Sequence, residues 1–154
     1  MQRYNQKAAP TGGNTTMENT VKFTSSTMHT GSMRCHTNFT PSGATFATDV
    51  PTALGGRGEN PTPGDMLAAC VASCMLSMIA YTGRRIEQDT EGICIKAACT
   101  EGPRGISGIE LDISVPITVP AAERKVLEAA ARSCPVGNAI HPDIPKKITW
   151  HWAD

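Results

Sequence analysis

The chain has 154 residues, which suits one domain with a substantial hydrophobic core. Its 14 basic and 14 acidic residues give a formal net charge of zero. A chain with no surplus of positive charge lacks the electrostatic footprint of a protein that binds nucleic acid or an anionic membrane surface. We therefore expect neither of these partners.

The amino-terminal part of the sequence is expected to lie outside the folded domain. The first residues are polar and rich in threonine, asparagine and glycine, and we expect 1–20 to be a flexible tail before a single domain over 21–154. The tail lacks the apolar segment of a secretory signal, so we expect a cytoplasmic protein. Between Val21 and Val50, short β-prone pieces alternate with turn sequences, which predicts strands that fold back on one another.

A loop rich in glycine and proline, Leu54 to Pro63, comes next. Its G-G-R-G sequence is a weak candidate for a phosphate-binding loop, and a plain loop is the simpler interpretation. The following sequence predicts a helix that begins at Pro63 and ends at Gly83. Its longest apolar run is too short to span a bilayer and is typical of a central helix that is covered on more than one side. The face expected to be buried consists of Leu67, Cys70, Val71, Cys74 and Met78.

Two further strands are predicted at Gly92–Thr100 and Ile106–Val119, joined as a hairpin by the turn E-G-P-R-G. Strand alternation in the second of them places four apolar residues on one face: Ile109, Leu111, Ile113 and Val115. The second helix begins after Pro120 and is interrupted by Pro135. Its expected buried stripe is Val126, Leu127, Ala130 and Cys134.

The chain closes with a predicted strand, K-I-T-W-H-W, which places Trp150 and Trp152 on the same face. The order of elements is strands, helix, hairpin, helix and strand. This order favours an α+β fold with a mainly antiparallel sheet.

The six cysteines are the residues most able to carry chemistry: Cys35, Cys70, Cys74, Cys94, Cys99 and Cys134. Without a secretory signal, a framework of disulfides is not expected, and a catalytic or metal-binding role is favoured. Zinc is disfavoured because Cys70 and Cys74 lie in the middle of a helix and not on a knuckle. For Cys35, Cys94 and Cys99, and also for Cys70, the preferred interpretation is a buried structural thiol.

Cys74 and Cys134 differ because each is expected on the buried face of its own helix, so helix packing could bring them close. Two thiols in one water-poor cleft can cycle between dithiol and disulfide. Cys134 could also cap a short helix begun by Pro135, and a helix amino terminus lowers the pKa of a cysteine. On these arguments alone Cys134 is the better candidate nucleophile, and two buried structural thiols remain the alternative.

Three stretches of the sequence share a pattern with known proteins. The first, residues 49–74, is D-V-P-T-A-L-G-G-R-G-E-N-P-T-P-G-D-M-L-A-A-C-V-A-S-C; the others are I-E-L-D-I-S-V-P and S-C-P-V-G-N-A-I. The first is similar to the motif D-x-P…GG…P-x-P-x-E-x-L-L-A-A…C, the second is the end of the predicted hairpin, and the third is similar to C-P-V-x-x-A. On these stretches, and over about 21–152, the chain resembles the OsmC/Ohr family of thiol-dependent peroxidases.

The resemblance implies an intertwined homodimer in which a mainly antiparallel sheet wraps around two central helices. It implies that Cys74 attacks a hydroperoxide and that Cys134 resolves the sulfenic acid as an intramolecular disulfide. An external dithiol reductant, thioredoxin-like or a lipoyl protein, would reopen the disulfide, and no cofactor or metal is implied.

The resemblance also implies that an arginine activates the attacking thiol and that a carboxylate early in the helix fixes this arginine. Asp65 stands at the carboxylate position of many relatives, whereas the organic-hydroperoxide branch has glutamate where this chain has Gly64. Arg34, in M-R-C-H, is the candidate arginine, and Arg57 is its competitor. Because Gly64 and Asp65 depart from the family's pattern at the start of the helix, the alternative function is a non-catalytic protein that senses redox state or binds a small ligand.

Overall fold

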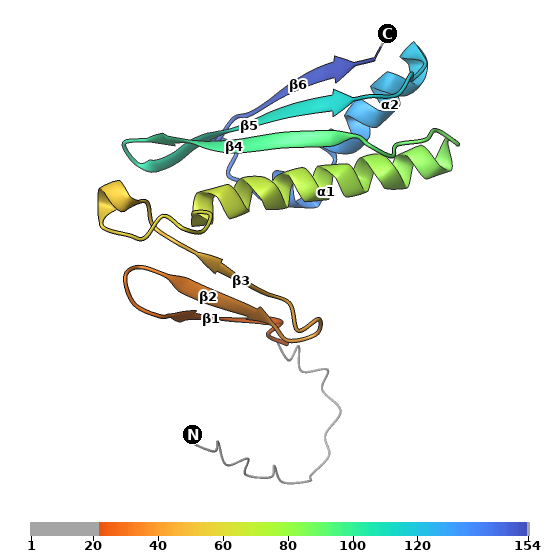
Figure 1. Cartoon of the computed structure of the whole chain (residues 1–154). Helices are drawn as coiled ribbons and strands as arrows, with labels where there is room; N and C mark the ends of the chain where they lie inside the picture. The colour runs from red at the N-terminus through yellow and green to blue at the C-terminus, as the bar shows by residue number, and fades with distance from the viewer. Residues whose placement is uncertain (1–21, 154) are drawn as a thin grey trace, which may run out of the picture.

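A computed structural model describes residues 22–153, and the predicted tail at 1–20 lies outside them. Figure 1 shows the arrangement of the elements. In chain order these are β1 (Ser25–His29), β2 (Cys35–Phe39), β3 (Thr45–Thr48), the 3-10 helix η1 (Thr52–Leu54), α1 (Pro63–Arg85), β4 (Cys94–Gly102), β5 (Gly105–Val115), α2 (Ala121–Arg132), α3 (Pro135–Asn138) and β6 (Lys146–Trp152).

The strands form two sheets, in the orders β1-β2-β3 and β4-β5-β6. All pairings are antiparallel except the one between β5 and β6, which is parallel. The α+β class and the mainly antiparallel pairing are therefore as the sequence predicts. The parallel β6 is possible because the chain crosses over through α2 and α3 before it returns to the sheet.

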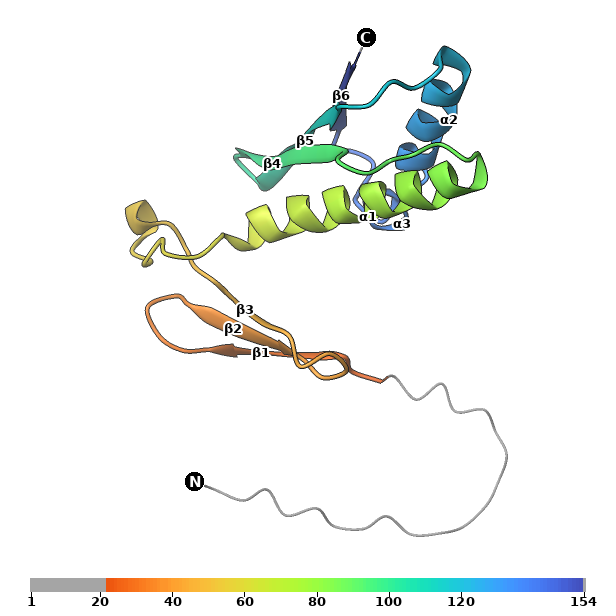
Figure 2. The same cartoon turned by 45° about the vertical axis from the view of Figure 1, so that its right-hand side comes forward.

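Two parts of the molecule are visible in Figures 1 and 2. The helices α1, α2 and α3 lie along one face of the β4-β5-β6 sheet, and we call this unit, residues 63–152, the body. The β1-β2-β3 sheet, residues 25–48, projects from the amino-terminal end of α1, and we call it the arm. By length and mean hydropathy, 23 residues and 1.7, α1 could cross a membrane. Its packing against β4, α2 and α3 makes it the central helix of the body.

The hydrophobic core lies between α1, α2 and the inner face of β5. The four alternating residues expected on one face of β5 are all buried: Ile109, Leu111, Ile113 and Val115. The buried face of α1 differs from the expected one and consists of Ala68, Val71, Ala72, Met75 and Ile79. Of the predicted set, only Val71 is fully buried and Cys70 is exposed. Because α1 is apolar around most of its circumference, periodicity could not select one face.

The predicted end of α1 at Gly83 is wrong, because the helix continues to Arg85. Gly83 is buried inside the last turn, and a Cβ there would lie 2.4 Å from Thr90 Cγ2. The left-handed conformation that often follows a helix is taken by Glu87, whose φ is 57°. Gly83 is therefore required for close packing and does not terminate the helix.

The buried stripe of α2 also differs from the prediction. Val126 is 42% exposed, whereas Leu127, Ala130 and Ala131 are buried. Cys134 is buried, but it belongs to the start of α3 and not to α2. The predicted strand that ran to Val119 ends at Val115 in the structure.

The final strand carries its two tryptophans on the same face, as predicted, and this face packs against the core. The rings of Trp150 and Trp152 are stacked, with centroids 5.0 Å apart and an interplanar angle of 4°. The guanidinium of Arg124 lies over Trp152, 5.3 Å from the ring centroid, and ties α2 to β6.

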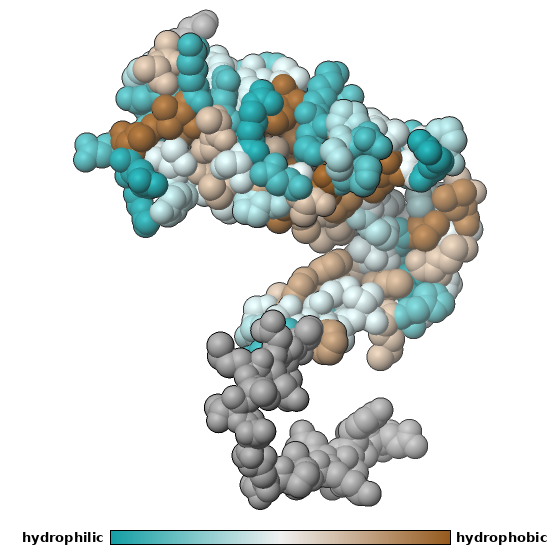
Figure 3. Space-filling model, turned by 180° about the vertical axis from the view of Figure 1, so that it is seen from behind, coloured by the Kyte–Doolittle hydropathy of each residue, from teal (hydrophilic) through white to brown (hydrophobic). Residues whose placement is uncertain are grey.

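Large apolar side chains are exposed directly before the arm, on the arm itself and in the 3-10 helix η1 after it. The exposed fractions are 83% for Phe23, 69% for Met28 and 69% for Leu54. Figure 3 shows the arm from behind, with apolar surface along the hollow between the arm and the body. In one chain, this surface is left uncovered.

Candidate active site

Cys74 lies in the middle of α1, and the start of this helix is fixed by a capping box. The Thr62 side chain accepts the Asp65 N–H at 3.1 Å, and Asp65 Oδ2 accepts the Thr62 N–H at 2.8 Å. Pro63 occupies the first turn, where its missing N–H is not needed. From this start, the helix carries Cys74 half-buried against the edge of the core.

Cys134 occupies the N-cap position of α3, directly before Pro135. Its side chain is 1% exposed, and the Gly137 N–H donates to its Sγ at 3.3 Å. Sγ also lies 3.8 Å from the Val71 carbonyl oxygen on α1. The predicted capping role is therefore present, and it places the Cys134 thiol directly against the central helix.

Cys74 lies beside this contact. It is close enough to Cys134 for the two side chains to interact electrostatically, and both residues are free thiols in the structure. Burial, followed by the interaction with Cys74, raises the pKa of Cys134 above its ordinary value. The expected lowering by a helix terminus is wrong because α3 has only four residues and its capping N–H does not offset burial. Cys134 therefore holds its proton.

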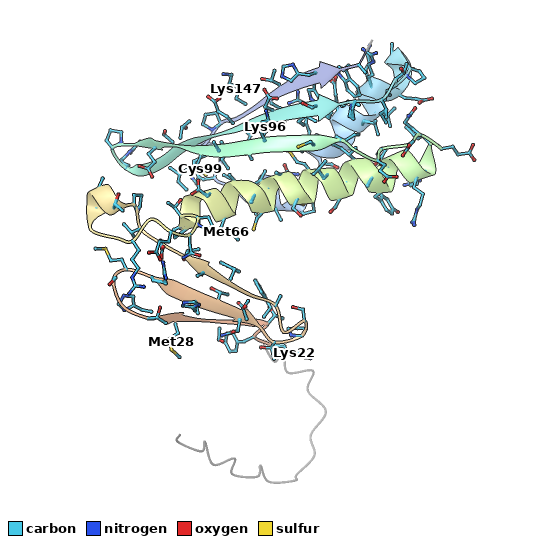
Figure 4. The ribbon with its side chains drawn as sticks, in the orientation of Figure 1. Lys22, Met28, Met66, Lys96, Cys99 and Lys147 are labelled. Atoms are coloured by element: carbon cyan, nitrogen blue, oxygen red, sulfur yellow. The ribbon has the colours of Figure 1, made fainter. Side chains whose placement is uncertain are left out.

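The other cysteines lie elsewhere. Cys99 on β4 donates its S–H to the Gly64 carbonyl oxygen at 3.1 Å, and Figure 4 shows it above the first turn of α1. Cys35 is half-buried, in keeping with a structural thiol, but Cys70 and Cys94 are exposed. The buried interpretation is wrong for these two, because they lie on outward faces of α1 and β4.

Arg34 does not contact Asp65 or Cys74 within the described chain. Its Nε and Nη2 donate to the two carboxylate oxygens of Asp49, each at 2.7 Å, and Nη2 also donates to Glu59 Oε2 at 2.6 Å. Asp65 is engaged in the capping box, and Arg57 is exposed. Helix packing brings Cys74 and Cys134 close, as expected, whereas Arg34 is held by two carboxylates that the sequence did not indicate.

Asp49 is the residue that the sequence analysis missed most clearly. It is buried, and the Arg34 guanidinium holds the pKa of its carboxyl far below the usual range. The carboxylate in turn raises the pKa of Arg34 further above its usual value. The signal was present in the D-V-P part of the first motif, where an aspartate directly follows a strand, but nothing in the sequence identified its partner.

The G-G-R-G loop uses its main-chain N–H groups within the protein. The Gly58 N–H donates to the Val50 carbonyl oxygen at 3.2 Å, and the Glu59 and Asn60 N–H groups donate to Asp49. A phosphate would need such groups to be free. Among the described residues, no cluster of three metal-ligating side chains is found.

A cavity of about 280 Å³ adjoins Cys134 between α3 and β6. Its apolar part is formed by Met75, Ile144 and Ile148, and Arg132 and Lys146 add positive charge. The Cys134 thiol therefore lies between the core and a small pocket.

Comparison with known proteins gives the following matches. The family model described as OsmC-like protein matches residues 56–149. No curated protein sequence matches the chain. A solved structure from Psychrobacter arcticus 273-4, provisionally assigned to osmotic stress induction and a detoxification response, is 31% identical, with a TM-score of 0.81 over 85% of this chain and 97% of that one.

Two further solved structures share the fold at lower identity. The organic hydroperoxide resistance protein OsmC of Legionella pneumophila is 22% identical, with a TM-score of 0.67 over 86% of this chain and 98% of its own. The organic hydroperoxide resistance protein of Elizabethkingia anophelis is 22% identical, with a TM-score of 0.65 over 87% and 99%. At this identity the likeness concerns the fold.

Proposed function

Because the chain belongs to the OsmC-like protein family, we propose that it is a thiol-dependent peroxidase that reduces organic hydroperoxides. Cys74 is the attacking thiol and Cys134 is the resolving thiol. The observation that carries the proposal is the interaction between these two neighbouring cysteines, which come from motifs about 60 residues apart in the sequence.

The Cys74 thiolate attacks the terminal oxygen of the hydroperoxide, the O–O bond breaks, and the alkoxide takes up a proton and leaves as the alcohol. Cys74 is then a sulfenic acid. Cys134 attacks the Cys74 sulfur as it gives up its proton, water leaves, and a disulfide forms. An external dithiol, thioredoxin-like or lipoyl, reduces this disulfide by two exchanges and is itself oxidised.

The electrostatics of the pair support this division of roles. A thiol whose pKa is raised by burial is a poor first nucleophile, and Cys134 is such a thiol. Its place beside Cys74, with its proton held, supports the role of resolving thiol for Cys134. Since Cys74 is only half-buried, a peroxide reaches it more readily than it reaches Cys134.

The activating cation comes from a second copy in this proposal. Within residues 22–153, no hydrogen bond or ion pair joins a cation to Cys74, and Arg34 is held on the arm. In a homodimer whose arms cover the bodies, Arg34 of one chain would approach Cys74 of the other. The exposed apolar side chains of the arm support such a contact.

The test is the consumption of cumene hydroperoxide with an excess of dithiol, followed by chemical assay of the remaining peroxide. Cys74→Ser should abolish turnover, and Cys134→Ser should slow it, because only the external dithiol can then resolve the Cys74 sulfenic acid. Cys94→Ser is the matched control, because this thiol is exposed on the outer face of β4. If Cys74→Ser consumes hydroperoxide as fast as wild type, the proposal is wrong.

A second candidate function is a redox sensor or small-ligand binder without turnover. It is favoured by the absence of a cation at Cys74 among the described residues and by Gly64 and Asp65 at the helix start. Such a protein could form the Cys74–Cys134 disulfide with peroxide, but it would show negligible steady-state consumption of hydroperoxide with an excess of dithiol.

A further inference from the structure

The carboxylate of Asp49 is surrounded by hydrogen-bond donors. Oδ1 accepts Arg34 Nε at 2.7 Å, and Oδ2 accepts Arg34 Nη2 at 2.7 Å, the Glu59 N–H at 2.9 Å, and Asn60 through its N–H at 3.0 Å and its side-chain amide at 3.1 Å. The residue is 1% exposed. The Asp49 carboxylate is therefore fixed in position, and its bidentate contact with Arg34 fixes the plane of the guanidinium.

The loop after β3 is shaped to supply these donors. Gly56 packs so closely that a Cβ would lie 1.9 Å from the Val50 carbonyl oxygen, and Gly58 has a positive φ of 63°. The loop closes with the Asp49 N–H donating to the Pro61 carbonyl oxygen at 3.1 Å. The glycines of G-G-R-G therefore let the chain turn back so that Glu59 and Asn60 reach Asp49.

Arg34 keeps one part of its guanidinium free for another group. Nε and Nη2 are used by Asp49 and Glu59, whereas Nη1 has no hydrogen-bond partner among residues 22–153. The side chain is 15% exposed. Asp65, which the resemblance assigns to the arginine, has its Oδ2 occupied by the N–H and the hydroxyl of Thr62.

We propose that the loop from Asp49 to Glu59 is a clamp that positions Arg34, with Asp49 as its fixed anchor and Glu59 as its second acceptor, in place of Asp65. The inference rests on the proposed function, because Arg34 is the cation that would serve Cys74. Asp49 and Glu59 are positioning residues, since they act through Arg34 and do not touch the reacting sulfur.

Two effects of the clamp oppose each other. The two carboxylates reduce the positive field of Arg34, but they hold Nη1 in one direction. A misplacement of about 1 Å in a catalytic arrangement costs up to about 100-fold in rate, so we expect orientation to dominate. Removal of a clamp carboxylate should therefore slow the reaction of Cys74 and raise the pH at which this thiol becomes reactive.

The experiment measures two quantities for each variant: the second-order rate of Cys74 oxidation by cumene hydroperoxide, and the pH midpoint of Cys74 alkylation by iodoacetamide, read by mass spectrometry. We expect Asp49→Asn to lower the rate by roughly 10- to 100-fold and Glu59→Gln to lower it several-fold, both with a raised midpoint. Asp65→Asn should have a smaller effect than Asp49→Asn. Glu110→Gln, which alters an exposed glutamate on β5, is the matched control for Glu59→Gln.

A rate and midpoint for Glu59→Gln equal to those of Glu110→Gln would overturn the proposal, whether or not Asp49→Asn folds. A larger loss in Asp65→Asn than in both clamp variants would also overturn it, as would a faster reaction after removal of either clamp carboxylate. The proposed function fails separately, if Cys74→Ser retains wild-type peroxide consumption.

Discussion

The Cys134 sulfur is subject to two opposing influences. The Gly137 N–H favours its thiolate, while burial against Val71 and the neighbouring Cys74 favour its protonated form. Burial dominates, and the pKa of Cys134 is raised. A motif that places cysteine before proline therefore does not by itself identify a reactive thiolate, because the surrounding core decides the protonation state.

The raised pKa of Cys134 predicts how the stability of the folded protein changes with pH. A thiol whose pKa is higher in the folded chain than in the unfolded one contributes stability below the ordinary thiol pKa of about 8.5, and this contribution is lost as pH rises through the raised value. Urea unfolding of the reduced protein should therefore show a steeper loss of stability above pH about 8.5 for wild type than for Cys134→Ala. Equal slopes for both proteins would contradict the raised pKa.

Among the elements, α1 shows how far the sequence determines the fold. Its start was predictable because Thr62, Pro63 and Asp65 are local signals that act within one turn. Its end was not, because Gly83 serves a contact with Thr90 in the following loop. Its buried face was also not predictable, since the choice among equally apolar faces is made by β4, β5 and α2.

The candidate site, like α1, could be predicted from the sequence only in part. The two cysteines could be predicted together because each belongs to a recognisable motif on an apolar element. The partners of Arg34 could not, because Asp49 and Glu59 reach it only through the path of an irregular loop. Local patterns predict elements, whereas contacts between loops depend on the folded backbone.

Gly83 gives a prediction at the scale of the helix. Gly83→Ala should destabilise the protein by about 1–3 kcal/mol, because the new methyl group would meet Thr90 and the Gln88 carbonyl oxygen. Gly64→Ala in the same helix is the matched control, since its Cβ would have only ordinary contacts, at 3.6 Å from Thr62 Oγ1 and 3.8 Å from Cys99 Cβ. This control should be neutral or stabilising by up to about 1 kcal/mol in chemical unfolding. Similar effects for both variants would contradict the close-packing role.

At the scale of the whole molecule, the arm is the part that one chain leaves incomplete. The β1 strand is exposed along its whole length, and Met28 on it is 69% exposed. Three strands with little buried apolar surface gain little stability from their own packing. We therefore propose that a second copy covers the arm.

The oligomeric state is directly measurable. Light scattering after size exclusion should give twice the 16.3 kDa of one chain, with a melting temperature that rises with protein concentration. Leu54→Arg, on the exposed loop after the arm, should shift the protein toward monomer. Val126→Arg, an exposed apolar position on α2 away from the arm in Figure 1, is the control and should stay dimeric. If the wild type is folded and monomeric at all concentrations, Arg34 of a second copy cannot serve Cys74, and the proposal of a site shared between two chains is contradicted.

A single-turnover experiment distinguishes a disulfide between Cys74 and Cys134 from every other pairing of the six thiols. Fully reduced protein, with six free thiols per chain, is treated with one equivalent of cumene hydroperoxide and digested for mass spectrometry. We predict loss of two thiols, a single disulfide between Cys74 and Cys134, and none in Cys74→Ser. A disulfide between any other pair, or unchanged thiols in wild type, would contradict the account.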